Sequence, residues 1–167
     1  SDCFKSKHEA AYVLRYSNTL QVIRAVPDTG INNAYDSAAG SAPLVKNRDN
    51  FDVQKASLAD SDHTFIAKYP GELGNAIEVH LFFGDSSDAV DSDFNAWAYK
   101  SYFDSKPKTS SYASDYSSKH DEVHVAVVDR TGAFGVRGQV LETFPYLSLA
   151  SGATNADGST NYIVDVI

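Results

Sequence analysis

The sequence lacks several features that define whole classes of protein. Its 167 residues contain no methionine, one cysteine (Cys3) and one tryptophan. No apolar segment approaches the roughly 20 residues that a membrane-spanning helix needs, and no signal-peptide pattern opens the chain, so we expect no membrane insertion. A single cysteine cannot form a disulfide within the chain, which favours synthesis in a reducing compartment.

Positive charge is also scarce. The chain has 14 Lys and Arg residues against 22 Asp and Glu residues, and its formal net charge is −8. A surface this acidic repels phosphate backbones, so we expect no direct binding of nucleic acid. Apolar residues make up 43% of the chain, which is enough for a packed core and argues against general disorder.

The length predicts one domain. Because methionine is absent and the chain stops inside the apolar run from Tyr162 to Ile167, we expect it to be an internal piece of a larger protein.

Hydrophobic periodicity predicts more strands than helices. The first helix is expected from Asp2 to about Tyr16, and a second one, carrying Trp97, within residues 94–103. Strands are predicted at residues 20–26, 64–69, 77–83 and 123–128, in a segment that includes Val136 and residues 140–144 after a turn at 129–132, and at the end of the chain after a turn at 155–158.

The segments between these elements predict the rest of the organisation. Residues 28–43, rich in Asn, Ala, Gly and Ser, are predicted to be a loop where an outer domain could be inserted. Residues 44–60 fit a short strand or a short helix, and residues 109–119 a surface connection. The expected fold class is α+β: an antiparallel-rich, two-layer β domain flanked by a few short helices.

The strongest metal-like pattern is His120-Asp121-Glu122-Val123-His124. On a helix, two histidines four residues apart share one face, as in helical zinc motifs. Here the pattern runs into a strand, where four residues span about 13 Å, so a solvated strand entry is the better interpretation. The acidic residues Asp85, Asp88, Asp91 and Asp93 could attract calcium, but they lack the glycine and the terminal glutamate of an EF-hand loop, which favours a hydrated acidic turn.

Other patterns also favour structural roles. Gly132, Gly135 and Gly138 match no dinucleotide or phosphate-binding loop and are predicted to bend a hairpin or bulge. Cys3 has no identifiable partner, and no nucleophile elbow is present. The aromatic residues Trp97, Tyr99, Tyr102 and Phe103 could stack on a sugar or base, but at this spacing they are more typical of a core. We therefore expect no enzymatic activity, no cofactor and no metal.

One segment remains unexplained by these patterns. Between two predicted strands lies the sequence YPGELGN, formed by Tyr69, Pro70, Gly71, Glu72, Leu73, Gly74 and Asn75. Proline fixes φ and glycine permits conformations closed to other residues, so we expect a stiff turn here. We also expect Leu73 to point inward and Asn75 to bond back to the backbone of the turn.

This segment carries a resemblance to a known family. FIAKYPGELGNAIEV resembles a segment of the tail sheath proteins of contractile-tailed bacteriophages. YSNTLQVIRAV is similar to the family's helix that leads into a strand. HDEVHVAVVDRTGAF, followed by VLETFPYLSLASGATNADGSTNYIVDVI, is similar to its later hairpin and closing segment. The resemblance covers most of the chain and is weakest at residues 29–43 and in the acidic segment.

The resemblance implies a structural role for the whole chain. Residues 1–167 would be the middle, or body, domain of a sheath subunit that polymerises as stacked hexameric rings around the tail tube. Contraction of the sheath would drive the tube through the host envelope. The implied partners are other sheath subunits, with the tube and the baseplate reached through regions mostly outside this chain. The implied location is the virion tail, after synthesis in the host cytoplasm.

Two alternatives stay open at this point. A related contractile injection system or a tail-derived bacteriocin would use the same kind of subunit. A carbohydrate- or receptor-binding β domain on a virion surface belongs to another class, and exposed aromatic residues from Trp97 to Phe103 would favour it.

Overall fold

The computed structural model describes residues 2–21, 32–35, 44–59, 64–84 and 89–167, with the backbone alone for residues 2–7, 55–59, 89 and 90. Two small antiparallel sheets and several short helices form this part of the chain. The α+β fold class predicted from the sequence is therefore confirmed.

The larger sheet has three strands in the order β3-β4-β5, namely β3 (Ile77–Phe83), β4 (Glu122–Asp129) and β5 (Val140–Ser148). All pairs are antiparallel, and β3 pairs along its whole length, from Ile77 opposite Asp129 to Phe83 opposite Val123. The predictions for β3 and β4 are confirmed. The prediction that placed Val136 in the next strand is wrong, because this residue lies in the β4–β5 loop and is 71% exposed.

Both faces of β4 are covered. Val123 and Val125 pack with Leu147 on one face, whereas Ala126 packs with Phe94 and Phe103 on the other. Successive side chains of a strand point to opposite faces, so a strand buried on both faces needs an almost continuous apolar run. Each fully buried Val or Leu contributes roughly 1.5–3 kcal/mol. The core of the molecule thus lies around β4.

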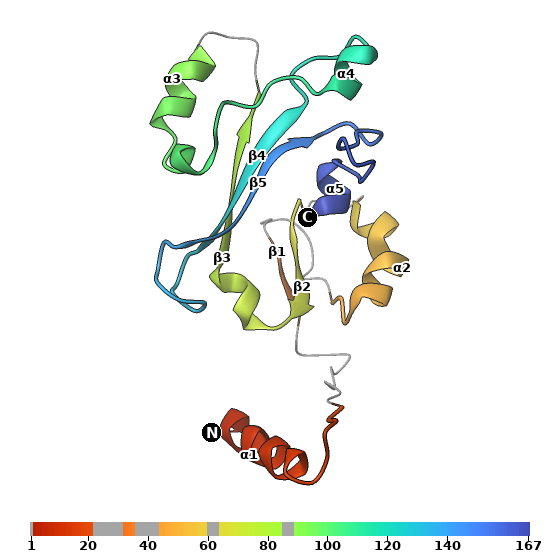
Figure 1. Cartoon of the computed structure of the whole chain (residues 1–167), viewed down its shortest axis with the longest axis vertical. Helices are drawn as coiled ribbons and strands as arrows, with labels where there is room; N and C mark the ends of the chain where they lie inside the picture. The colour runs from red at the N-terminus through yellow and green to blue at the C-terminus, as the bar shows by residue number, and fades with distance from the viewer. Residues whose placement is uncertain (1, 22–31, 36–43, 60–63, 85–88) are drawn as a thin grey trace.

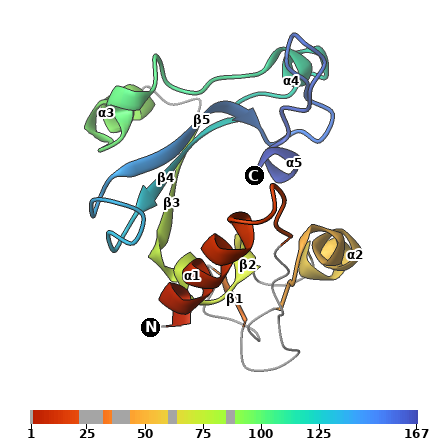
Figure 2. The same ribbon diagram turned by 60° about the horizontal axis from the view of Figure 1, so that its bottom comes forward.

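Different elements cover the two faces (Figures 1 and 2). The helix α3 (Ala89–Ala96) lies on one side, and the short helix η2 (Lys100–Tyr102) follows it in the chain. The two-stranded sheet, α2 (Arg48–Ala59) and α5 (Ile163–Val166) lie on the opposite side. The helix α4 (Ser111–Asp115) occupies part of the predicted surface connection. The helix predicted within residues 94–103 corresponds to α3, which begins earlier than predicted and ends before Trp97.

The smaller sheet pairs β1 (Asn33–Tyr35) with β2 (Ile66–Pro70), with Asn33 opposite Pro70. β2 was predicted, but β1 forms inside the segment predicted to be a loop, of which the structure describes residues 32–35. The ambiguous residues before β2 form α2. This helix begins there because the side chain of Asn47 accepts a hydrogen bond from the N–H of Asn50 at 2.8 Å and caps its first turn.

The helix predicted at the start of the chain is confirmed as α1 (Asp2–Leu14). Figure 1 shows it apart from both sheets, and its residues Tyr12 and Leu14 are exposed. Of the strand predicted at 20–26, Leu20 and Gln21 are not in a strand, and the remainder falls outside the described residues.

The final segment differs from its prediction. It forms the helix α5 instead of a strand, after a single parallel bridge between Tyr162 and Ser148. The turn before it is confirmed, since the N–H of Gly158 donates to the carbonyl of Asn155 at 2.9 Å. Strand periodicity and a one-turn helix cannot be separated in so short an apolar run.

Candidate functional site

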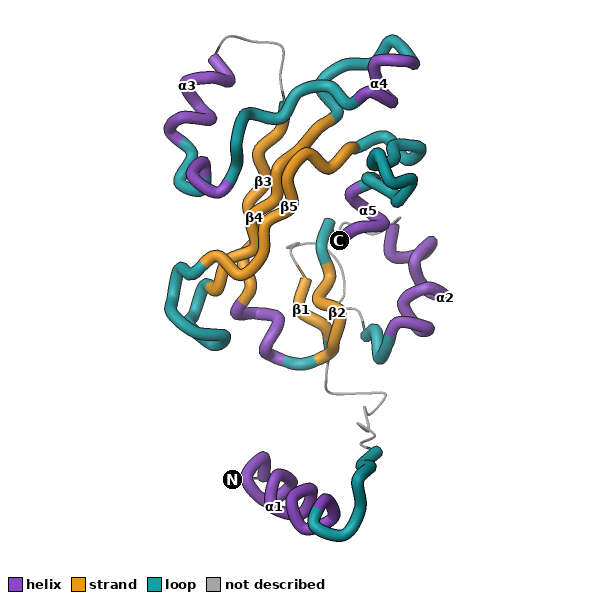
Figure 3. Tube along the Cα trace, viewed as in Figure 1, coloured by secondary structure: helices purple, strands orange, loops and turns teal. Residues whose placement is uncertain are grey.

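The segment Tyr69–Asn75 connects the two sheets. β2 ends at Pro70, the short helix η1 (Glu72–Ala76) follows, and β3 begins at Ile77 (Figure 3). We call residues 69–76 the connector. Because no loop separates η1 from β3, the connector sets the orientation of the smaller sheet relative to the larger one.

Gly71 makes the bend at the start of the connector. Its φ is 119° and its ψ 176°, a conformation that is essentially restricted to glycine. Its N–H donates to the carbonyl of Asn32 at 2.9 Å. Pro70 is buried and has no N–H, so this bond continues the pairing of the two strands one residue beyond the proline.

Gly74 is required for a different reason. It is not among the glycines with positive φ, but a Cβ atom at this position would lie 2.6 Å from the Cβ of Ala67 and 2.8 Å from that of Ala34. The absent side chain lets η1 lie directly against both strands of the smaller sheet. The two glycines of the segment therefore act separately, one through its backbone angles and the other through close packing.

Two expectations for the connector are wrong. Leu73 does not point inward, because it is 59% exposed. The hydrogen bond described for Asn75 involves its main-chain carbonyl and not its side chain. This carbonyl accepts from the Nη2 atom of Arg130 at 2.8 Å. The N–H of Arg130 also donates to the carbonyl of Ala76 at 2.7 Å. The connector is thus attached to the start of the β4–β5 loop.

Asp129 organises this loop. Its buried carboxylate accepts hydrogen bonds from the N–H groups of residues 131–135, at distances between 2.7 and 3.2 Å. Burial alone would raise the pKa of the carboxyl group, but these bonds outweigh burial and hold the pKa of Asp129 below its ordinary value. The predicted turn at 129–132 is therefore a longer loop wrapped around one carboxylate.

The predicted role in bending the hairpin is confirmed for Gly132 and Gly138. Gly132 and Gly138 have positive φ values of 88° and 83°, and the loop joins two antiparallel strands. The N–H groups of Gly132 and Gly135 donate to Asp129.

Asn33, which lies on β1 beside the connector, has a structural role that the sequence did not predict. It is buried, its Nδ2 atom donates to the carbonyl of Ala67 at 2.6 Å, and its Oδ1 atom accepts from the N–H of Val45 at 2.6 Å. One amide side chain therefore links β1, β2 and the segment that leads to α2. An asparagine inside an Asn-rich stretch gives no sequence signal for such a role.

The histidine pattern separates into two unrelated residues. His124 is fully buried in β4, so the interpretation of a solvated strand entry is wrong for it. Its Nδ1 atom accepts from the N–H of Tyr146 at 3.0 Å, and its Nε2 atom lies 2.7 Å from the carbonyl of Ser105. The Ser105 carbonyl can only accept, so Nε2 carries a proton, and Nδ1 carries none because it accepts the N–H of Tyr146; the ring is therefore neutral. Burial lowers the pKa of His124, against the opposing effect of the Ser105 bond.

His124 has a structural task in the sheet. The register of β4 and β5 shifts beside it, and Tyr146 has a φ of 55°. This register shift is a β-bulge. The N–H of Tyr146 leaves the hydrogen-bond ladder there and donates to the Nδ1 atom of His124 instead. His120, outside the strand and with a φ of 59°, takes no part in this arrangement.

The acidic segment is partly described. Residues 85–88 lie outside the described residues. Asp91 and Asp93 are exposed on the helix α3, so the prediction of an acidic turn is wrong for these two residues. Asp91 forms an ion pair of 2.8 Å with Lys106. Within the part of the chain that the structure describes, no group of three His, Cys, Asp or Glu residues is placed to hold a metal ion. Nothing is described of the Cys3 side chain.

The aromatic residues form a core, as predicted, with one exception. Phe103 stacks on His124 with ring centroids 4.4 Å apart, and Trp97 packs against Phe103 at 5.2 Å. Tyr99 lies edge-on to Trp97. Tyr102 is the exception, since its side chain is exposed.

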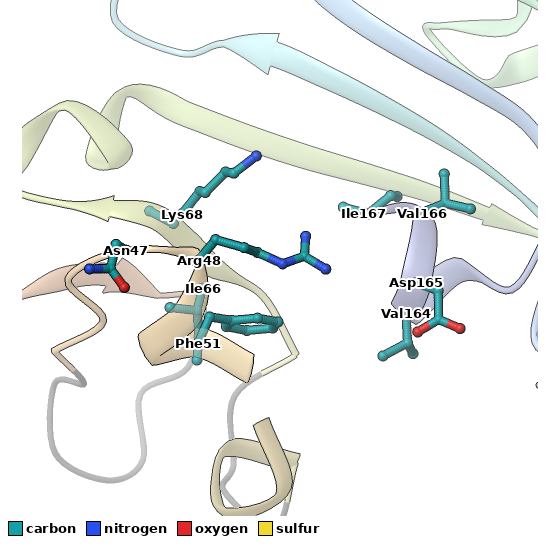
Figure 4. A pocket seen from close by; sticks show the side chains of 10 residues that line it. Asn47, Arg48, Phe51, Ile66, Lys68, Val164, Asp165, Val166 and Ile167 are labelled. Carbon is teal, nitrogen blue, oxygen red and sulfur yellow. The ribbon is translucent and has the colours of Figure 1, made fainter. Parts of the chain in front are cut away.

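A pocket lies beside the connector, between α2, β2 and α5 (Figure 4). Its volume is about 160 Å³. The side chains of Arg48 and Lys68 enter it from one wall, and α5 forms the facing wall. The lining residues are Asn47, Arg48, Phe51, Ile66, Ala67, Lys68, Val164, Asp165, Val166 and Ile167.

Comparison with known proteins does not identify this chain. No protein family, no curated protein and no solved structure matches it. Among the helices described here, none is long and apolar enough to cross a membrane.

Proposed function

We propose that this chain is the body domain of a structural subunit of a contractile phage tail sheath. The complete subunit would polymerise as stacked hexameric rings around the tail tube and would contract to drive the tube through the host envelope. Its partners would be other sheath subunits, with the tube and the baseplate contacted mostly by regions outside this chain. The domain would act without catalysis and without a cofactor.

The observation that carries this proposal is the construction of the connector. The segment with the most specific resemblance to sheath proteins is also the segment that joins the two sheets. Gly71 and Gly74 fix it through backbone angles and packing, and Arg130 attaches it to the β4–β5 loop. A subunit that moves as a rigid body during contraction needs its sheets held in one fixed relation, so that energy is stored between subunits.

The core gives the proposal further support over the carbohydrate-binding alternative. A sugar-binding platform needs open aromatic faces. Here Phe103 is stacked on His124, and Trp97 contacts Phe82, Phe94 and Phe103. These rings already have neighbours within the domain. A related contractile injection system or a tail-derived bacteriocin would use the same domain, and the genes beside its own would separate these cases from a phage tail.

Negative-stain electron microscopy of the complete parent protein, expressed alone, tests the proposal. Hollow tubes with a helical lattice of six-fold character are the expected result. Discrete particles that never polymerise, even at high protein concentration, would contradict it, and a glycan-binding screen would then examine the alternative class.

A further inference from the structure

We propose that the pocket between α2, β2 and α5 binds a carboxylate that is attached to a compact apolar group. Its volume of about 160 Å³ is close to the ~150 Å³ of an apolar cavity that accommodates benzene. This volume is below the roughly 300–1,000 Å³ that is usual for small-molecule and cofactor pockets, so the ligand must be smaller than a drug-sized molecule or must be a single side chain. This site is independent of the sheath proposal.

Arg48 supplies one half of the carboxylate site. Its Nε atom lies 3.2 and 3.3 Å from the two carboxylate oxygens of Asp52, and its guanidinium group is 6.0 Å from the centre of the Phe51 ring. These contacts hold one edge of the guanidinium group. Arginine has five N–H donors in a planar fork, so the Nη groups remain available for a second carboxylate.

Lys68 supplies the other half. Its side chain extends from β2 toward the same space as that of Arg48 (Figure 4). Among the described residues it forms no ion pair. The one acidic lining residue, Asp165, carries its carboxylate at the opposite end of the pocket in this view. Arg48 and Lys68 against Asp165 leave the lining with one excess positive charge, in a chain whose net charge is −8, and this excess favours an anion.

The remaining walls select the rest of the ligand. Phe51 and Ile66 lie beside the cationic groups (Figure 4), and Val164, Val166 and Ile167 contribute to the other wall. Burial of an apolar group against these side chains stabilises the complex. A singly charged carboxylate fits this mixed lining, with Asp165 nearby, better than a doubly charged phosphate, which loses more hydration.

Such a ligand has two sources: a free organic acid, or an acidic side chain beside an apolar residue in a partner peptide. The test is an NMR titration of the labelled chain with phenylacetate and, as a neutral match, phenylacetamide. We expect saturable shifts of the amides of Phe51 and residues 66–68 with phenylacetate and weaker binding of phenylacetamide. Equal binding of the two compounds, or shifts that never saturate, would overturn the proposal.

Charge-removing variants make the test specific. Arg48→Gln and Lys68→Gln should each weaken phenylacetate binding about 3-fold, as expected for partly exposed ion pairs, with amide spectra that remain dispersed. Lys100→Gln, on η2 away from the pocket, is the matched control and should bind as the wild type does. If both pocket variants bind as the control does, the cations take no part and the proposal is wrong.

A peptide arm distinguishes the two sources. Acetyl-Phe-Glu-amide is compared with acetyl-Phe-Gln-amide and with phenylacetate. Tighter binding of the Glu peptide than of phenylacetate supports the site and assigns it to a protein partner. Weaker binding of this peptide than of phenylacetate supports the site and assigns it to a free acid.

Discussion

Replacement of Gly71 by alanine tests the connector most directly. Its φ of 119° and ψ of 176° cost an ordinary residue about 1–3 kcal/mol. Alanine also reduces the freedom of the unfolded chain, which offsets about 0.4–1 kcal/mol of this cost. The expected net destabilisation is about 1–2 kcal/mol. At about 2–4 °C per kcal/mol for a chain of this size, the melting temperature should fall by about 2–8 °C.

Gly74→Ala should also destabilise, but through contact. Its Cβ atom would meet the Cβ atoms of Ala67 and Ala34 at 2.6 and 2.8 Å, and such overpacking costs about 1–3 kcal/mol. Gly135→Ala is the matched control. Gly135 does not have a positive φ, and its nearest neighbour is the terminal Oε1 atom of the flexible Gln139 side chain. We expect little change in this control.

Thermal unfolding followed by far-UV circular dichroism, with urea unfolding at a fixed temperature, measures all three variants. The bulkier Gly71→Val should lose at least as much stability as Gly71→Ala. The reasoning is refuted if Gly71→Ala melts at or above the wild-type temperature, or if Gly135→Ala loses as much as the connector variants.

Three further variants test other parts of the structure. Asp129→Ala leaves five backbone N–H groups without their acceptor, so its melting temperature should fall well below that of Asp157→Ala, whose carboxylate is exposed; equal losses would contradict the role of Asp129. Because the pKa of His124 is lowered, the unfolded chain takes up a proton that the folded chain excludes. Stability should therefore decline as the pH falls below about 6.5, and His124→Gln should flatten this slope in urea unfolding at several pH values. Leu73→Ser changes an exposed side chain, so the free energy of unfolding should stay within about 0.5 kcal/mol of the wild type, and a larger loss would mean that Leu73 is packed.

Secondary structure was predicted most reliably where a single hydrophobic pattern was strong. The alternation along β3 and the apolar run of β4 predicted both strands, because burial of a strand face enforces a period of two. The resemblance drew attention to the connector, and the expected stiffness at Gly71 agrees with its positive φ.

The sequence failed where distant partners decide the structure. β1 has only three residues, and its pairing with β2 depends on a buried side chain, Asn33, whose partners lie elsewhere in the chain. The start of α2 could have been predicted, since Asn47 and Asn50 have the spacing of a helix cap. Leu73 was expected to point inward after the stiff turn, but it lies on a short helix that packs through Gly74 instead.

The position of β4 has a consequence for the order in which the fold can form. β4 and β5 are joined by a short loop, whereas β3 can pair with β4 only after residues 84–121 have closed into a loop. Closure of this longer loop costs more chain entropy and slows folding. The loop contains Phe94, Trp97 and Phe103, which gather against β4 on the face that Phe82 of β3 shares. Packing of this aromatic cluster would offset part of the entropy of closure, and we expect β3 to be the last strand of the larger sheet to pair.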